Sequence, residues 1–155
     1  MRRLLFLVML AATGLTAAPQ YARMGADIYD IRADGSRQID DALAKARASH
    51  RKVLLDFGAN WCIWCRRLHH TFQTDAAVRA KLADSYLIVM IDVNTRDGAW
   101  RNTEVDRRYG NPTRLGIPVL VVLDENGRIL ATKDTGELEE GNHHSPAKIL
   151  AFLGK

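Results

Sequence analysis

Cys62 and Cys65 are the residues of this chain whose type and spacing point most directly to chemistry. They are the only cysteines, and two residues separate them, so they cannot join distant segments as a stabilising framework would. A thiol pair at this spacing can instead alternate between a dithiol and a disulfide. One sulfur would attack a partner disulfide as a thiolate, and the other would resolve the mixed disulfide that results.

The pair is expected at the start of a helix. Residues 53–57 run almost without a polar residue, which is typical of a strand buried on both faces, and a short turn separates them from the cysteines. A cysteine at a helix N-terminus meets unpaired backbone N–H groups and the positive end of the helix dipole, which favour a thiolate. We therefore predict that Cys62 is the nucleophile. Arg66, four residues later, would either add positive charge near the sulfur or be solvated.

Hydrophobic periodicity predicts helices and strands along most of the chain. Helices are expected over 37–49, from about 61 to 72, around 78–82, between 100 and 109, and over 146–154 behind a Ser145 cap. Strands are expected near 28–31 and over 53–57, 86–93, 117–123 and 128–132, with 86–93 in a central position and an Asn126-Gly127 hairpin turn before the last. This order predicts an α/β fold with a central mixed β-sheet flanked by helices on both faces.

Composition is that of one soluble globular domain. The chain has 155 residues, of which 47% are hydrophobic and 26% charged, which excludes disordered, coiled-coil and collagen-like classes. The formal net charge of +4 is spread along the sequence without a basic block, so no nucleic acid partner is predicted.

The N-terminal residues resemble a targeting segment. Arg2 and Arg3 precede an apolar run over 4–10 and small residues up to Ala18, which predicts a cleaved signal peptide over 1–18. The apolar run is shorter than the ~20 residues that span a bilayer, and an uncleaved membrane anchor is the alternative. We expect an N-terminal arm over 19–36 and the folded domain over 37–155. Export would place the cysteines in an oxidising compartment, the periplasm.

Three segments carry a resemblance to a known family. Residues 54–65, with the sequence LLDFGANWCIWC, resemble the active-site segment of the thioredoxin superfamily. Residues 116–120 (GIPVL) look like its cis-proline strand, and 124–128 (DENGR) look like the hairpin that follows. From about residue 53 onward, the chain looks most like exported single-domain thioredoxin-like proteins related to the C-terminal domain of the membrane reductant transporter of the bacterial periplasm. The resemblance implies a thioredoxin fold.

The resemblance also implies roles for individual residues. The two cysteines would be the attacking and the resolving thiol. Asp56 would be the buried carboxylate near them, either as a proton shuttle or as a buried polar residue bound to water. Trp61 would pack beside the site. Pro118 would be the cis-proline facing the disulfide, which lets the backbone of Ile117 pair with an incoming peptide.

Departures from the family pattern limit what can be transferred. Ile63 and Trp64 replace the usual Gly-Pro between the cysteines, so the reduction potential does not transfer. The lysine that pairs with the buried acid in typical thioredoxins is missing, because the matching stretch 88–91 is apolar. Residues 94–116 form an insertion whose Trp100 and Tyr109 are expected to fill the core, with a substrate groove as the alternative.

Other readings of the cysteine pair stay open. Cys62 and Cys65 could bind copper or zinc together with His69, although tetrahedral zinc requires a fourth ligand. An inert structural disulfide is a further alternative, although so short a loop stabilises little. The adjacent residues His143 and His144 are expected on the surface.

The sequence thus favours a periplasmic protein thiol-disulfide oxidoreductase. Ile63 and Trp64 supply neither charge nor a hydrogen-bond acceptor, so the reduced form gains less than in a strong oxidase of this fold. Since Ile117 precedes Pro118, as in reducing thioredoxins, a reductase is favoured over a thiol oxidase or an isomerase. No organic cofactor is implied. The expected partners are protein thiols and disulfides and a membrane reductant carrier.

Overall fold

The computed structural model describes residues 24–94 and 99–154, so the expected signal peptide over 1–18 lies outside the described residues. The helices are α1 (Gly35–Ser49), α2 (Ile63–Thr74), α3 (Ala76–Ser85), α4 (Thr103–Arg108) and α5 (Pro146–Leu153). The strands are β1 (Lys52–Gly58), β2 (Tyr86–Asp92), β3 (Val119–Leu123), β4 (Ile129–Asp134), β5 (Glu139–Glu140) and β6 (His143–His144). Within the described ranges, no helix is both long and apolar enough to cross a bilayer.

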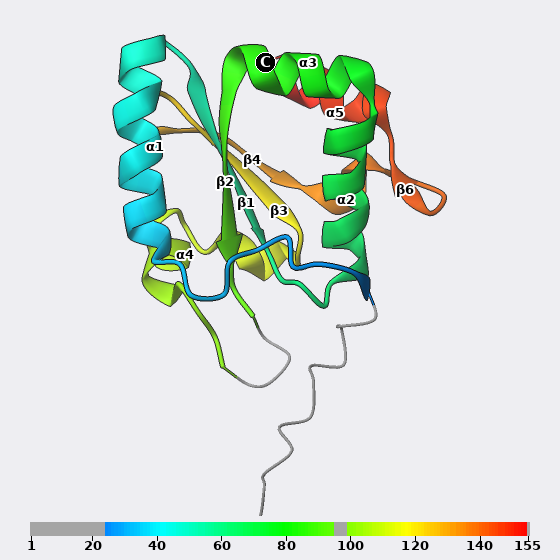
Figure 1. Cartoon of the computed structure of the whole chain (residues 1–155), viewed down its shortest axis with the longest axis horizontal. Helices are drawn as coiled ribbons and strands as arrows, with labels where there is room; N and C mark the ends of the chain where they lie inside the picture. The colour runs from blue at the N-terminus through cyan, green and yellow to red at the C-terminus, as the bar shows by residue number, and fades with distance from the viewer. Residues whose placement is uncertain (1–23, 95–98, 155) are drawn as a thin grey trace, which may run out of the picture.

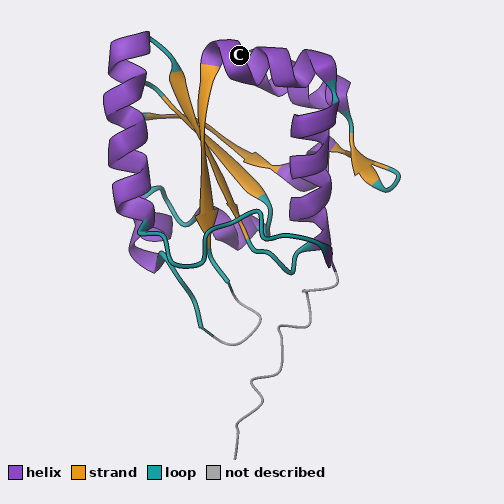
Figure 2. Ribbon diagram, viewed as in Figure 1, coloured by secondary structure: helices purple, strands orange, loops and turns teal. Residues whose placement is uncertain are grey.

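The main sheet is mixed, which confirms the predicted fold class. Its strand order in the described part of the chain is β2-β1-β3-β4 (Figure 2). β1 runs parallel to β2 and antiparallel to β3, and β4 pairs with β3 in a hairpin. Gly127 takes a φ of +84° in the hairpin turn, a conformation that favours glycine. Every residue of β1 after Lys52 is buried, so the strand that leads to the cysteines lies in the interior of the sheet.

Helices cover both faces of the sheet. α1 and α4 lie on one face, and α2, α3 and α5 lie on the other (Figure 1). Residues of the α1 side include Ile39, Leu43, Leu55, Phe57, Val105 and Tyr109. Residues of the α2 side include Leu54, Leu68, Phe72, Val78, Leu120 and Ile149.

Strand alternation decides on which face the buried acid of β1 lies. Successive side chains of a strand point to opposite faces. Leu55 and Phe57 belong to the α1 side and Leu54 to the α2 side, so Asp56 shares the face of Leu54. Its carboxyl group therefore lies under α2, the helix that the cysteine pair begins.

The short strand expected near 28–31 does not form. The backbone N–H groups of Ile28 and Tyr29 donate instead to the side-chain oxygen of Asn60, at 2.8 and 2.9 Å. Since none of the arm residues that the structure describes joins the sheet, β2 lies at the edge of the described sheet and is not central as expected. Ile88 on β2 is accordingly 39% exposed.

Smaller expectations were also wrong. Trp100 precedes α4 and is 58% exposed, whereas Tyr109 fills the core as expected. His144 is fully buried because β6 packs against α2, and only its neighbour His143 is exposed. Ser145 occupies the cap position of α5, but its side chain makes no capping hydrogen bond.

Candidate active site

Cys62 is the N-cap residue of α2. Its Sγ atom accepts a hydrogen bond from the backbone N–H of Cys65 at 3.1 Å. The pKa of the Cys62 thiol is lowered, chiefly because the Cys65 thiol donates a hydrogen bond to its sulfur, and the N–H groups of Trp64 and Cys65 add to the effect against the cost of burial. The first sulfur is thus the one that the fold holds ready as a thiolate.

Cys65 has the opposite environment. It lies in the first turn of α2 with no exposed surface. Burial strongly raises the pKa of its thiol, and the hydrogen bond to Cys62 and the nearby Asp56 carboxylate raise it further. Both cysteines are free thiols here. The second sulfur therefore stays protonated until a base removes its proton.

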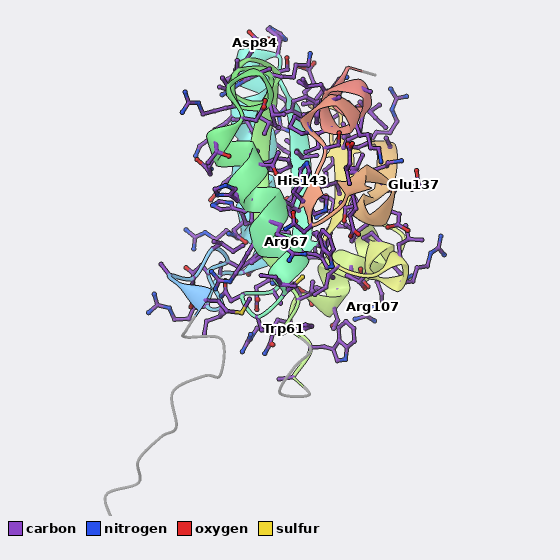
Figure 3. All side chains as sticks on the ribbon, turned by 90° about the vertical axis from the view of Figure 1, so that its right-hand side faces the viewer. Trp61, Arg67, Asp84, Arg107, Glu137 and His143 are labelled. Carbon is purple, nitrogen blue, oxygen red and sulfur yellow. The ribbon has the colours of Figure 1, made fainter. Side chains whose placement is uncertain are left out.

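The segment before β3 lies against the first sulfur. The Ile117-Pro118 peptide bond is cis, and the carbonyl oxygen of Ile117 lies 3.6 Å from Sγ of Cys62. Trp61 packs beside the same cluster, and its indole N–H donates to the side-chain oxygen of Asn94 at 3.2 Å. Figure 3 shows Trp61 just beyond the lower end of α2. The fold thus gathers these sequence-predicted residues around one sulfur.

Asp56 is completely buried below the cysteine pair. Burial raises the pKa of its carboxyl group to about 7, against a hydrogen bond from Tyr29 that lowers it. The tyrosine hydroxyl donates to Oδ1 at 3.0 Å, and Oδ2 has no hydrogen-bond partner within the described residues. A carboxyl group with such a pKa can both take up and release a proton near neutral pH.

Tyr29 is the site residue that sequence reasoning missed. It comes from the N-terminal arm, and only 1% of it is exposed. The side chain of Asn60 holds its backbone at both ends, because Oδ1 accepts from the N–H and Nδ2 donates to the carbonyl at 2.9 Å. The sequence carried one indirect signal, namely that the acid lacks the lysine partner usual in the family.

Arg66 fixes the same arm to α2. Its guanidinium group donates to the carbonyl oxygens of Asn60 at 2.7 Å, Ala26 at 2.9 Å and Met24 at 3.1 Å. This side chain is therefore not a freely solvated group, which was one of the two expectations from the sequence. It ties the arm to the turn before Cys62.

Trp64, between the cysteines, packs between two basic side chains. The guanidinium group of Arg67 lies over its ring at 4.4 Å, and the ring of His144 meets it edge-on at 5.5 Å. Burial lowers the pKa of His144 to about 4, with the positive charges of His143 and Arg67 adding to the effect. His144 is therefore neutral at physiological pH.

The proposed copper or zinc site is not formed by the residues that the structure describes. Nowhere in these ranges do three His, Cys, Asp or Glu side chains gather closely enough to hold a metal ion. His69 on α2 thus does not form a group of three metal ligands with Cys62 and Cys65.

A family comparison agrees with this geometry. A model described as thioredoxin-like matches residues 34–125, more than half of the chain. The chain belongs to the thioredoxin-like family. With Cys62 and Cys65 in place, it is a thioredoxin-like disulfide oxidoreductase.

Individual relatives of this thioredoxin-like protein are consistent with the assignment. The crystal structure of a disulphide isomerase from Xylella fastidiosa Temecula1 is 36% identical, covers 83% of this chain and 95% of that chain, and superposes with a TM-score of 0.73.

Two curated relatives are named thiol:disulfide interchange protein DsbD. The Ralstonia nicotianae protein is 47% identical over 62 residues, which are 40% of this chain and 10% of that protein. The Actinobacillus pleuropneumoniae protein is 33% identical over 90 residues, or 57% of this chain and 14% of that protein. The thioredoxin-like chain thus matches only a small part of each of these longer proteins.

Proposed function

We propose that the protein is a periplasmic protein-disulfide reductase. The observation that carries the proposal is the difference between the two sulfurs. Cys62 is stabilised as a thiolate at the helix N-terminus, whereas Cys65 is buried and held as a thiol. This is the division of labour that stepwise thiol-disulfide exchange requires.

The reaction has two balanced steps. The Cys62 thiolate attacks one sulfur of a substrate disulfide, a mixed disulfide forms, and the first substrate thiolate leaves and takes up a proton. The Cys65 thiol then gives its proton to the Asp56 carboxylate and attacks Sγ of Cys62. The second substrate sulfur leaves as a thiolate and takes up a proton, so the substrate gains two electrons and two protons and the protein becomes a disulfide.

The substrate lies along the segment before β3 in this proposal. An extended peptide can pair with the backbone of Ile117 next to the reactive sulfur, as in strand addition. Pro118 has no backbone N–H, so it makes no hydrogen bond as a donor here, and the backbone next to it stays open to the substrate. Trp61 forms the opposite wall.

Completion of the cycle requires a second dithiol that reduces the Cys62-Cys65 disulfide. We assign this role to a membrane reductant carrier, in keeping with relatives named thiol:disulfide interchange proteins. The signal-like sequence of residues 1–18 supports export to the periplasm. Cell fractionation with alkylation of the cysteines tests both points: the protein should be periplasmic and mostly reduced.

Equilibration with glutathione tests the direction of electron flow. A reductase requires a potential well below that of oxidising members of the fold. A midpoint above about −180 mV would exclude a reductase and leave an oxidase.

A disulfide isomerase is the second candidate, because the Xylella fastidiosa relative carries that name. A substrate protein with scrambled disulfides separates the two. An isomerase restores the native pairing without net consumption of reductant, whereas a reductase releases free thiols in proportion to the dithiol consumed.

A further inference from the structure

We infer that Tyr29 is a positioning residue for the resolving step, in which it holds the Asp56 carboxylate charged and oriented to take the proton of Cys65. The inference rests on the proposed exchange reaction and extends it to the N-terminal arm. The tyrosine keeps its own proton throughout, and the proton that leaves Cys65 passes to Asp56.

The hydrogen bond between Tyr29 and Asp56 is buried on both sides. The hydroxyl donates to Oδ1 at 3.0 Å, and neither residue is more than 1% exposed. A donor in such an environment stabilises the charged carboxylate more than the neutral acid. The tyrosine thus opposes the burial that otherwise favours the protonated form.

The same hydroxyl lies beside the resolving sulfur. Gly58, two residues after Asp56, shows this by what a side chain there would meet. A Cβ atom at position 58 would collide with the Tyr29 hydroxyl and stand 2.8 Å from Sγ of Cys65. The tyrosine hydroxyl, the acid and the resolving thiol therefore lie close together over β1, which also explains why position 58 holds glycine.

The arm cannot easily withdraw from this place. Asn60 binds the backbone of Tyr29 through both its N–H and its carbonyl, and Arg66 binds the carbonyl oxygens of Met24 and Ala26. Both clamping residues flank the cysteine pair. The turn and helix that position the nucleophile thus also position the tyrosine.

Reaction with 5,5′-dithiobis(2-nitrobenzoate) tests the inference, because it separates attack from resolution. The first thionitrobenzoate released reports attack by Cys62, and the second reports resolution by Cys65. Tyr29→Phe removes only the hydroxyl. We expect the pH profile of the second phase to move up by about one unit, which is ~10-fold slower resolution below neutral pH. The rates should converge in alkali.

Matched variants distinguish this role from a structural one. Tyr86→Phe removes another buried hydroxyl, which donates to the Leu153 carbonyl at 2.8 Å, and should leave the second-phase profile in place. In an Asp56→Asn background, Tyr29→Phe should have no further effect. Tyr29→Leu, which also lacks the hydroxyl but differs in shape, should shift the profile like Tyr29→Phe.

The outcomes separate the inference from the proposed function. A folded Tyr29→Phe variant whose second phase superimposes on that of the native protein overturns the role of Tyr29 and leaves the exchange reaction standing. Absence of a second phase in the native protein would instead remove the resolving role of Cys65 and with it the proposed reaction.

Discussion

The sulfur of Cys62 lies 3.6 Å from the carbonyl oxygen of Ile117, although 55 residues separate the two in sequence. When protonated, the Cys62 thiol donates toward this oxygen, and in either form its sulfur accepts from the backbone N–H of Cys65. The nucleophile is thus held between the start of α2 and the chain entering β3. In the proposed reaction, a substrate disulfide approaches along that second segment.

The first prediction concerns the order of the two thiols. Cys62 should alkylate faster near neutral pH, because its pKa is lowered while burial raises that of Cys65. Cys65→Ala should accumulate mixed disulfides with substrate, whereas Cys62→Ala should not. Mass spectrometry of the alkylated and trapped species measures both, and equal labelling of the two sulfurs would refute the assignment.

The second prediction concerns Asp56 and stability. Its pKa is about 7 in the folded protein and 3.8 when unperturbed, so the folded state binds the extra proton. The associated stability is present below about pH 4 and is lost as the pH rises through 7. Relative to the native protein, Asp56→Asn should gain about 1.4 kcal/mol in unfolding free energy per pH unit over this window and then level off. Urea unfolding from pH 4 to 9 measures the difference, and a constant offset would contradict the raised pKa.

The third prediction concerns His144 and has the opposite sign. Its pKa is about 4 in the folded protein, against 6.5 unperturbed. The stability from its neutral form is present above pH 6.5 and is lost as the pH falls through 4. His144→Phe should therefore lose less stability in acid than the native protein, by about 1.4 kcal/mol per pH unit over that window. Thermal unfolding checks this against Tyr86→Phe, which should keep the native pH dependence.

The fourth prediction concerns Asn60. Its buried side chain makes three hydrogen bonds with the backbone of Ile28 and Tyr29. Asn60→Ala should lower the unfolding free energy by about 2–4 kcal/mol and speed amide hydrogen exchange at residues 28 and 29. Asn142→Ala, at an exposed loop position, is the control. Unchanged exchange at these two amides would show that the arm does not depend on Asn60.

Local patterns were sufficient to predict the elements that position the cysteines. The apolar run at 53–57 and the spacing of Leu68 and Phe72 predicted β1 and α2, and Asn126-Gly127 predicted the β3–β4 hairpin. These signals are local because strand burial, helix periodicity and turn chemistry act within a few residues. The resemblance added Asp56, six residues before Cys62, and Pro118, whose distance from the sulfurs along the chain hides its proximity.

Contacts between distant segments could not be predicted in this way. The sequence predicts a short strand near 28–31 in the arm, but the backbone groups of Ile28 and Tyr29 bind the side chain of Asn60 instead. The sequence predicts a surface position for His144, but its side chain is buried and packs against Trp64. In both cases a tertiary partner far along the chain overrides the local pattern.

The arm also determines how the domain would be oriented relative to any group attached at its N-terminal end. Arg66 binds the carbonyl of Met24, the first described residue, so the chain enters the domain beside the start of α2, where Cys62 lies (Figure 1). If a linker attached this end to a membrane or to a further domain, the Cys62 sulfur would face the attached membrane or domain. An affinity tag placed there would crowd incoming substrates, whereas α5 at the opposite end offers an attachment point that leaves the dithiol open.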